Sequence, residues 1–293
     1  MNKKYKLIFP YLLLLPVLLF IFGIFIFGIV NIFLQSFGYF PAVGLKLFSL
    51  RYYKEILKDP NFFYSLKFSL YISFISSLLS VILGVLLAYL FLSTYLNDKA
   101  KFYNIYKISV IVPHTIAAFL VFTIFSQSGF LSRIFFRLGF INNMVEFYPM
   151  TFDTKGIGVI LAYVWKGAPF ITLITYDILK KLSDTYSKVA LNLGANNFQV
   201  FWYILFPLVL PTISLGFIIL FTFSFGAYEI PYLLGPSKPK ALPVLAYIYY
   251  KSVNLKDRPY SMVINVFIIL FSLVLAFLYI LLNKIIKKHG IDR

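Results

Sequence analysis

The chain has 293 residues, a formal net charge of +17, and 61% hydrophobic against 13% charged residues. Several windows exceed the roughly 18 apolar residues that indicate a transmembrane helix, so a soluble domain is excluded. The basic residues stand at the ends of apolar runs, which favours contact with a lipid bilayer over a nucleic-acid partner. Because the chain has no cysteine, disulfides, thiol catalysis and cysteine-ligated metals are excluded.

The apolar runs predict an all-α, polytopic membrane protein with six transmembrane helices in a single transmembrane domain, residues 1–293. We expect the spans at residues 7–36, 66–93, 104–126, 157–179, 204–227 and 261–283. The first run has a basic start but is about twice as long as the core of a signal peptide, so we interpret it as a retained span. Six spans place both termini on one side of the membrane. Lysines lie close to the span ends on that side, so we predict that both termini are cytoplasmic.

Two local patterns predict how spans two and three are placed. Small residues recur every fourth position in span two, at Ser76, Ser80, Gly84 and Ala88. Small residues let a neighbouring helix approach closely, so we expect tight packing; a role in lining the solute pathway is the alternative. After span three, residues 129–140 place two arginines among large apolar residues, which predicts a short helix in the membrane interface.

The most informative stretch is SKVALNLGANNFQVFWYILFP, from Ser187 to Pro207. Apolar residues precede it at helical spacing and predict a face that rests on the bundle; they are Leu179, Leu182, Tyr186, Val189 and Leu193. Gly194 predicts a turn with left-handed backbone, after which a second helix leads into span five. The stretch therefore predicts a helix, a turn and a helix at the cytoplasmic surface; an ordinary interfacial helix is the alternative.

A few polar residues near the spans are candidates for the solute pathway, namely His114, Trp165, Tyr228 and Glu229. A carboxylate near the membrane is costly unless paired or solvated, so Glu229 is a candidate for attracting a cation; an ion pair or a solvated loop is the alternative. We expect Lys166 to extend to the outer interface. No catalytic set, phosphate-binding loop or metal cluster is visible, so we expect no enzyme activity and no cofactor.

The stretch between spans four and five resembles a pattern found in permeases of binding-protein-dependent ABC importers. Their cytoplasmic pattern is Glu-Ala-Ala, three residues, Gly, nine residues, Ile, one residue, Leu-Pro. This chain carries, at those spacings, Lys188-Val189-Ala190, Gly194, Ile204, Phe206 and Pro207. Two residues depart from the pattern, since Lys188 replaces the Glu and Phe206 replaces the Leu.

Other segments also resemble this family, at residues 9–20, 51–73 and 163–170. Residues 224–250 are most similar to the branch that handles polyamines, ferric iron or phosphonates rather than sugars. The resemblance implies the type I importer fold and residues 180–206 as the coupling-helix region. The residues that it places against an ATPase are Asp184, Ser187, Lys188, Ala190, Gly194, Ala195, Asn196 and Phe198.

The resemblance also implies a mechanism and a set of partners. Two cytoplasmic ATPase subunits, a second permease that is related but different, and an extracytoplasmic solute-binding protein would work together by alternating access. The chain would lie in a bacterial inner membrane. A secondary transporter without an ATPase is the alternative, although the sequence has no visible internal repeat and few intramembrane acids.

Overall fold

The structure is a computed structural model that describes residues 3–93 and 106–288. Within that part the chain is helical, and its only strand-like pairing is an isolated bridge between Phe40 and Leu45. Six stretches are long and apolar enough to cross a membrane: Leu13–Ser36, Pro60–Leu92, His114–Arg137, Ile157–Asn192, Asn197–Gly226 and Leu255–Leu281. The predicted all-α fold with six membrane-spanning stretches is therefore confirmed.

The chain divides into two compact units. The first comprises residues 1–60 and 246–267, and the second comprises residues 61–245 and 268–293. Two helices contribute substantially to both units, α11 (Leu242–Tyr250) and α12 (Arg258–Lys288), and a third, α3 (Pro60–Ser93), has only its first residue, Pro60, in the first unit.

The first unit contains α1 (Lys3–Ser36), the 3-10 turn Pro41–Val43, α2 (Arg51–Ile56) and the 3-10 turn Leu255–Asp257. The hydroxyl of Tyr260 and the Nε of Arg51 both donate to the carboxylate of Glu55. These hydrogen bonds, that from Tyr260 first, hold the pKa of the Glu55 carboxyl below its ordinary value. The apolar side chains of α1 from Leu13 to Phe27 are exposed, which suits a helix whose surroundings are hydrocarbon.

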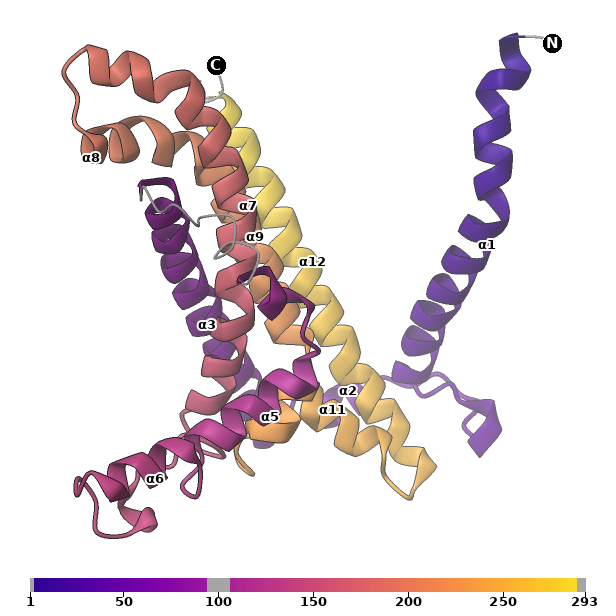
Figure 1. The fold of residues 1–293 in the computed structure, drawn as a ribbon. Helices are drawn as coiled ribbons and strands as arrows, with labels where there is room; N and C mark the ends of the chain where they lie inside the picture. Colours follow the sequence, from indigo (N-terminus) through magenta and orange to yellow (C-terminus); the bar gives the residue numbers. More distant parts are fainter. Residues whose placement is uncertain (1–2, 94–105, 289–293) are drawn as a thin grey trace. The chain divides into compact units, whose positions relative to one another are not determined.

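The second unit contains the remaining helices, shown in Figure 1. They are α3 (Pro60–Ser93), a short helix at 106–111, α5 (His114–Phe125), α6 (Phe130–Arg137), α7 (Ile157–Asn192), α8 (Asn197–Val200), α9 (Phe206–Gly226) and α10 (Glu229–Leu234). A 3-10 turn lies at Met144–Glu146, and Phe201–Leu205 is a π-helix between α8 and α9. The central helix is α7, which packs against α5, α9 and α10.

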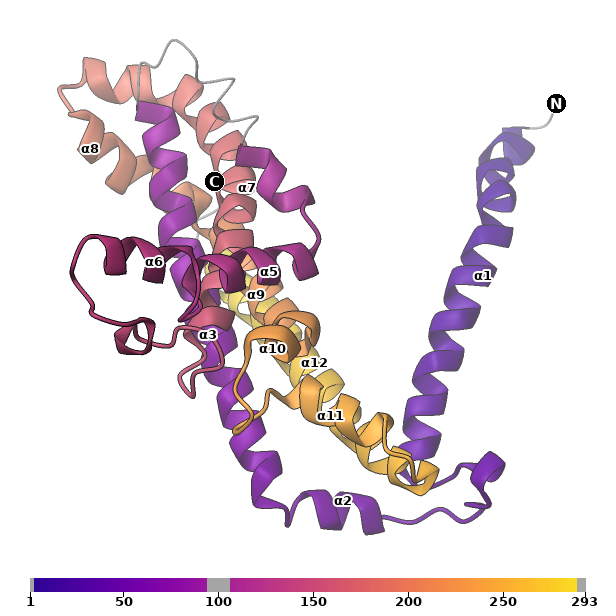
Figure 2. The ribbon, with the colours of Figure 1, turned by 60° about the horizontal axis from the view of Figure 1, so that its bottom comes forward.

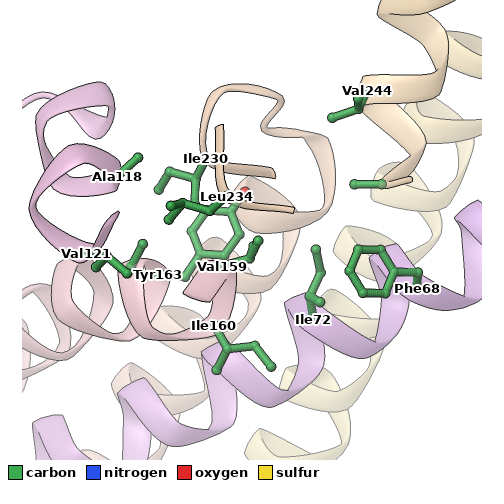
Figure 3. Packing of buried hydrophobic residues seen from close by; sticks show 12 residues of the cluster. Phe68, Ile72, Ala118, Val121, Val159, Ile160, Tyr163, Ile230, Leu234 and Val244 are labelled. Carbon is green, nitrogen blue, oxygen red and sulfur yellow. The ribbon is translucent and has the colours of Figure 1, made fainter. Parts of the chain in front are cut away.

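At one end of the second unit, five helices pack together through a hydrophobic cluster (Figure 3). Its side chains come from α3, α5, α7, α10 and α11, and include Phe68, Ile72, Ala118, Val121, Val159, Ile160, Tyr163, Ile230, Leu234 and Val244. Figure 2 shows α5 and α10 gathered at this end of α7. The cluster packs the start of α7 against four other helices and so holds this end of α7 in place.

The small-residue pattern in α3 is a helix-packing surface, as predicted. Ser76, Ser80 and Ala88 are buried. The hydroxyl of Thr172 in α7 donates to the carbonyl of Gly84 at 3.1 Å. A methyl group on Gly84 would lie 2.6 Å from the Cβ of Ile171, closer than carbon atoms tolerate. The backbone of α3 at Gly84 therefore packs directly against the Ile171 side chain of α7.

The predicted third span is wrong as a single helix. The helix at 106–111 ends at Val112–Pro113, and α5 begins at His114; residues 104 and 105 of the predicted span lie outside the described residues. Proline has no backbone N–H, and its ring disfavours the helical conformation in the residue before it. Within residues 129–140 the structure has the short helix α6, and its place in the membrane interface stays a prediction.

Gly84→Ala is expected to destabilise the second unit. Overpacking of this kind typically lowers the free energy of unfolding by about 1–3 kcal/mol, here because the new methyl group meets Ile171. Gly28→Ala is the matched control, since a methyl group there meets nothing within 4 Å and alanine favours a helix. Thermal unfolding in mild detergent measures both; an equal response of the two variants would contradict the close approach of α3 and α7.

Candidate coupling surface and transmembrane cavity

The end of α7 is closed by a Schellman motif centred on Gly194. Gly194 has φ +91°, the N–H of Ala195 donates to the carbonyl of Ala190 at 3.1 Å, and the N–H of Gly194 donates to Leu191 at 3.0 Å. This pair of hydrogen bonds satisfies carbonyls that a helix end leaves free. The left-handed conformation predicted for Gly194 is confirmed, and it turns the chain back toward α3.

The return helix begins with a capping box. The Asn196 side chain accepts from the N–H of Gln199 at 2.8 Å, and the Gln199 side chain accepts from the N–H of Asn196 at 2.9 Å. The sequence analysis missed Gln199, although the spacing Asn-x-x-Gln two residues after a glycine is a recognisable start signal. Hydrogen bonds therefore restrain both sides of the turn, between backbone groups on the α7 side and between side chains and backbone on the α8 side.

The return segment is anchored by buried apolar side chains. Val200, Phe201 and Leu205 pack with Leu179 of α7 and Val209 of α9. The aromatic ring of Phe201 lies 4.4 Å from that of Tyr89 in α3, centroid to centroid. The tip is thus fastened to the inner parts of three helices.

The predicted apolar face of this stretch lies against the bundle only in its first half. Leu179 is fully buried, but Val189 is 60% exposed and Leu193 is 84% exposed. The reason is that α7 continues beyond the end of α3, so only the side bearing Ala190 is covered by the return segment. Phe198 is also 62% exposed, which leaves an apolar surface at the tip. We name this surface, made by Val189, Leu193 and Phe198, the apolar tip.

Charged residues stand beside the apolar tip but not within it. Asp184 and Lys188 are exposed, and neither takes part in an ion pair among the described residues. From Val189 to Phe206 the sequence carries no charge. The cations Lys180, Lys181 and Lys188 outnumber Asp184, so this end of α7 is positive.

The other residues predicted to meet an ATPase have different environments. Ser187 is partly buried and shares a hydrogen bond of 2.8 Å with the hydroxyl of Ser183. Ala190 is buried and Ala195 is partly buried, so both support the turn. Asn196 is exposed, but its side-chain oxygen is engaged in the capping box. A partner that meets the tip therefore meets mainly Leu193, Phe198 and Lys188.

A cavity of about 200 Å³ lies further along α7, next to the break in the third span. The residues that line it come from the break, α7 and α9: Val110, His114, Tyr163, Lys166, Gly167, Phe170, Ile219, Leu220, Phe223 and Ser224. The His114 ring packs on Phe223 with centroids 4.8 Å apart. The cavity therefore joins polar groups to an otherwise apolar wall.

Lys166 points into the break rather than to the membrane interface. Its ammonium group donates to the carbonyls of Ser109 at 2.9 Å, Val110 at 2.8 Å, and Val112. The expectation that Lys166 extends to the outer interface is therefore wrong. Pro113 explains the difference, because the interrupted helix leaves carbonyl groups that need a donor.

The four predicted pathway residues lie in different environments. His114 lines the cavity, whereas Glu229, the first residue of α10, is exposed and is not among the cavity-lining residues. Trp165 faces a different groove, which it lines with Tyr106 and Pro169. Tyr228 is partly buried and packs on Tyr232, 5.3 Å between ring centroids. No group of three or more metal-ligating side chains occurs in the described part of the chain.

Comparison with known families decides what kind of membrane protein this is. Residues 80–289 match the family described as binding-protein-dependent transport system inner membrane component. The chain belongs to this family. It is a multi-pass membrane protein and a permease subunit of an ABC importer, so the family assignment favours this class over a secondary transporter.

Two curated relatives carry names that include different solutes. The sulfate transport system permease protein CysT of Synechocystis is 25% identical over 181 residues, which are 62% of this chain and 60% of that protein. The spermidine/putrescine transport system permease protein PotB of Haemophilus influenzae is 27% identical over 140 residues, 48% of each chain. The matched region thus spans less than two thirds of each of these relatives.

A solved structure supports the fold over the whole length. The chain resembles a bacterial ABC transporter involved in the import of the acidic polysaccharide alginate, with a TM-score of 0.81 and 17% sequence identity. The match covers 97% of this chain and 98% of that chain. The likeness confirms the predicted importer-permease fold.

Glu229→Gln is expected to weaken uptake of a cationic solute at low ionic strength without lowering the amount of protein. One exposed charge typically contributes up to about 1 kcal/mol, so the half-saturating concentration should rise about two- to fivefold. The effect should shrink as salt is added, because exposed charges are screened. Initial rates of uptake into vesicles measure this.

Glu146→Gln is the control for that experiment, since it removes an exposed carboxylate from a loop outside the predicted spans. Unchanged uptake by Glu229→Gln at every solute concentration would leave Glu229 with a structural role only.

Proposed function

We propose that this permease subunit forms half of a solute pathway that works by alternating access, and that residues 180–206 connect it to a cytoplasmic ATPase. The rigid tip at Gly194 is the observation that carries the proposal. Its two hydrogen-bonded ends and its exposed apolar surface have no evident use within the chain. A large exposed apolar surface on a fixed element is a feature of interaction sites.

The helix α7 provides the mechanical link from the tip to the cavity. It is 36 residues long, about 54 Å at ~1.5 Å per residue, and contains Pro169. The tip lies at one end, and Tyr163 and Lys166 line the cavity further along the same helix. A force on the tip would therefore move cavity-lining groups as part of a rigid body, which is how packed helices transmit switching movements.

The partners proposed for the complex are two ATPase subunits, a second and different permease, and an extracytoplasmic binding protein. The family description, which is binding-protein-dependent transport, supports the last of these. The segment 224–250 and the likeness to the spermidine/putrescine permease support a polyamine-like solute. The names of the sulfate and alginate systems mention anionic solutes, so uptake should be assayed with both cationic and anionic solutes.

We also propose that both termini and the apolar tip lie on the cytoplasmic side. Lysines near the span ends support this orientation. Within the second unit, α8 and the C-terminal end of α12 lie toward one end and α6 toward the opposite end (Figure 1), an arrangement that fits the proposal.

Protease accessibility tests the orientation. A tag at Arg293 should resist protease added to intact cells, whereas tags inserted near Lys155 or Lys240 should be cut. The reason is that Lys155 and Lys240 lie in the loops that precede α7 and α11, on the proposed outer side. Cleavage at Arg293, with protection at the two loops, would reverse the orientation.

Gly194→Val is expected to uncouple the ATPase from transport. A side chain at φ +91° is strained by about 1–3 kcal/mol, and a β-branched one is the least tolerated. Because a side chain at this position meets nothing within 4 Å in the chain itself, the spans should fold normally. Retention of the ATPase during purification and transport in vesicles are the measurements. Lys188→Ala should have a smaller effect.

Gly139→Val is the matched control for Gly194→Val. Gly139 also has a positive φ, +76°, and open space around it, but it follows α6 on the other side of the proposed bilayer. The proposal requires that only Gly194→Val loses the ATPase or its response to solute. Normal transport and ATPase retention by Gly194→Val would show that this stretch is not the coupling element.

A further inference from the structure

Three backbone carbonyls converge on one ammonium group at the break in the third span. The Nζ of Lys166 donates to the carbonyls of Ser109 at 2.9 Å, Val110 at 2.8 Å, and Val112. A lysine ammonium has three N–H donors, so all of its donors are used. Lys166 is therefore held by three carbonyls at the break, and we call these three acceptors the cage.

The cage exists because the helix at 106–111 is interrupted at Pro113. The residue that would donate to the carbonyl of Ser109 in a continued helix is Pro113, which has no N–H. The carbonyl end of a helix carries partial negative charge and favours a cation. In a membrane no bulk water replaces the missing donors, so a cation with several N–H groups is the fitting partner.

The cage selects for an ammonium by hydrogen bonding and not by charge pairing. Lys166 forms no ion pair among the described residues. Three neutral carbonyl oxygens around one point are satisfied by N–H donors in three directions, which a primary ammonium has and a quaternary ammonium lacks. The adjoining cavity of about 200 Å³ gives room for an alkyl chain next to the cage.

We propose that the carbonyls of residues 109–112 form a binding site for a primary ammonium group, which Lys166 fills in this structure. When the Lys166 side chain is shortened, the site accepts a free primary alkylammonium. A group tethered by a short linker has an effective concentration of at least about 1 mM, so Lys166 excludes free amines from the intact protein. The proposal concerns this site alone and is independent of the coupling role of the tip.

Chemical rescue of Lys166→Ala tests the site. The substitution removes the equivalent of one propylammonium group, so the midpoint of thermal unfolding of the purified protein should fall, by about 5 °C. n-Propylammonium chloride should restore most of the loss. Tetramethylammonium chloride, which has the charge but no N–H, and 1-propanol, which has the chain length but no charge, should not.

Lys166→Met is the matched control variant, because its uncharged side chain fills much of the space of lysine and should block rescue. If Lys166→Ala gives no folded protein, the yield of folded protein from cells grown with each additive provides the same comparison. Rescue by n-propylammonium alone supports the site. No loss of stability, no rescue, or equal rescue by tetramethylammonium would overturn it.

Discussion

A backbone carbonyl inside a membrane must find its donor within the protein, and this constraint explains the unusual parts of the second unit. A continuous helix meets it automatically. The third span does not, because Pro113 interrupts it, and the ammonium of Lys166 from α7 replaces the missing donors. Two spans are thereby joined by hydrogen bonds at the cavity, where irregular backbone can persist only if the protein surrounds it.

The C-terminal end of α7 poses the same problem of unsatisfied carbonyls. There the free carbonyls of α7 are satisfied by the turn at Gly194, and the return segment is anchored by Phe201 and Leu205. Both features therefore depend on α7, which supplies Lys166 to the break, ends at the turn, and approaches α3 closely at Gly84 between them. A change imposed at one site cannot be absorbed by loose packing between them, since Gly84 leaves no room for movement against Ile171.

The sequence was sufficient for features that depend on local chemistry. Apolar length predicts the spans, a glycine predicts the left-handed turn, and small residues at Ser76 and Ser80 predict close packing. It was insufficient where the outcome depends on distant groups. Pro113 is visible in the sequence, but nothing local indicates that Lys166, more than fifty residues later, supplies its donors. The exposure of Leu193 was also missed, because helical spacing does not tell where the neighbouring helices end.

In the proposed contact with the ATPase, the apolar and the charged residues of the tip would have different roles. Leu193 and Phe198 are exposed and apolar, and no charge interrupts the sequence around them. Burial of such side chains gives most of the strength of an interface, whereas charges at its edge mainly set orientation and association rate. Lys188 stands at that edge with no ion-pair partner among the described residues. Its charge is opposite to that of the family pattern, so it would alter which ATPase surface is accepted while the apolar centre keeps the strength of binding.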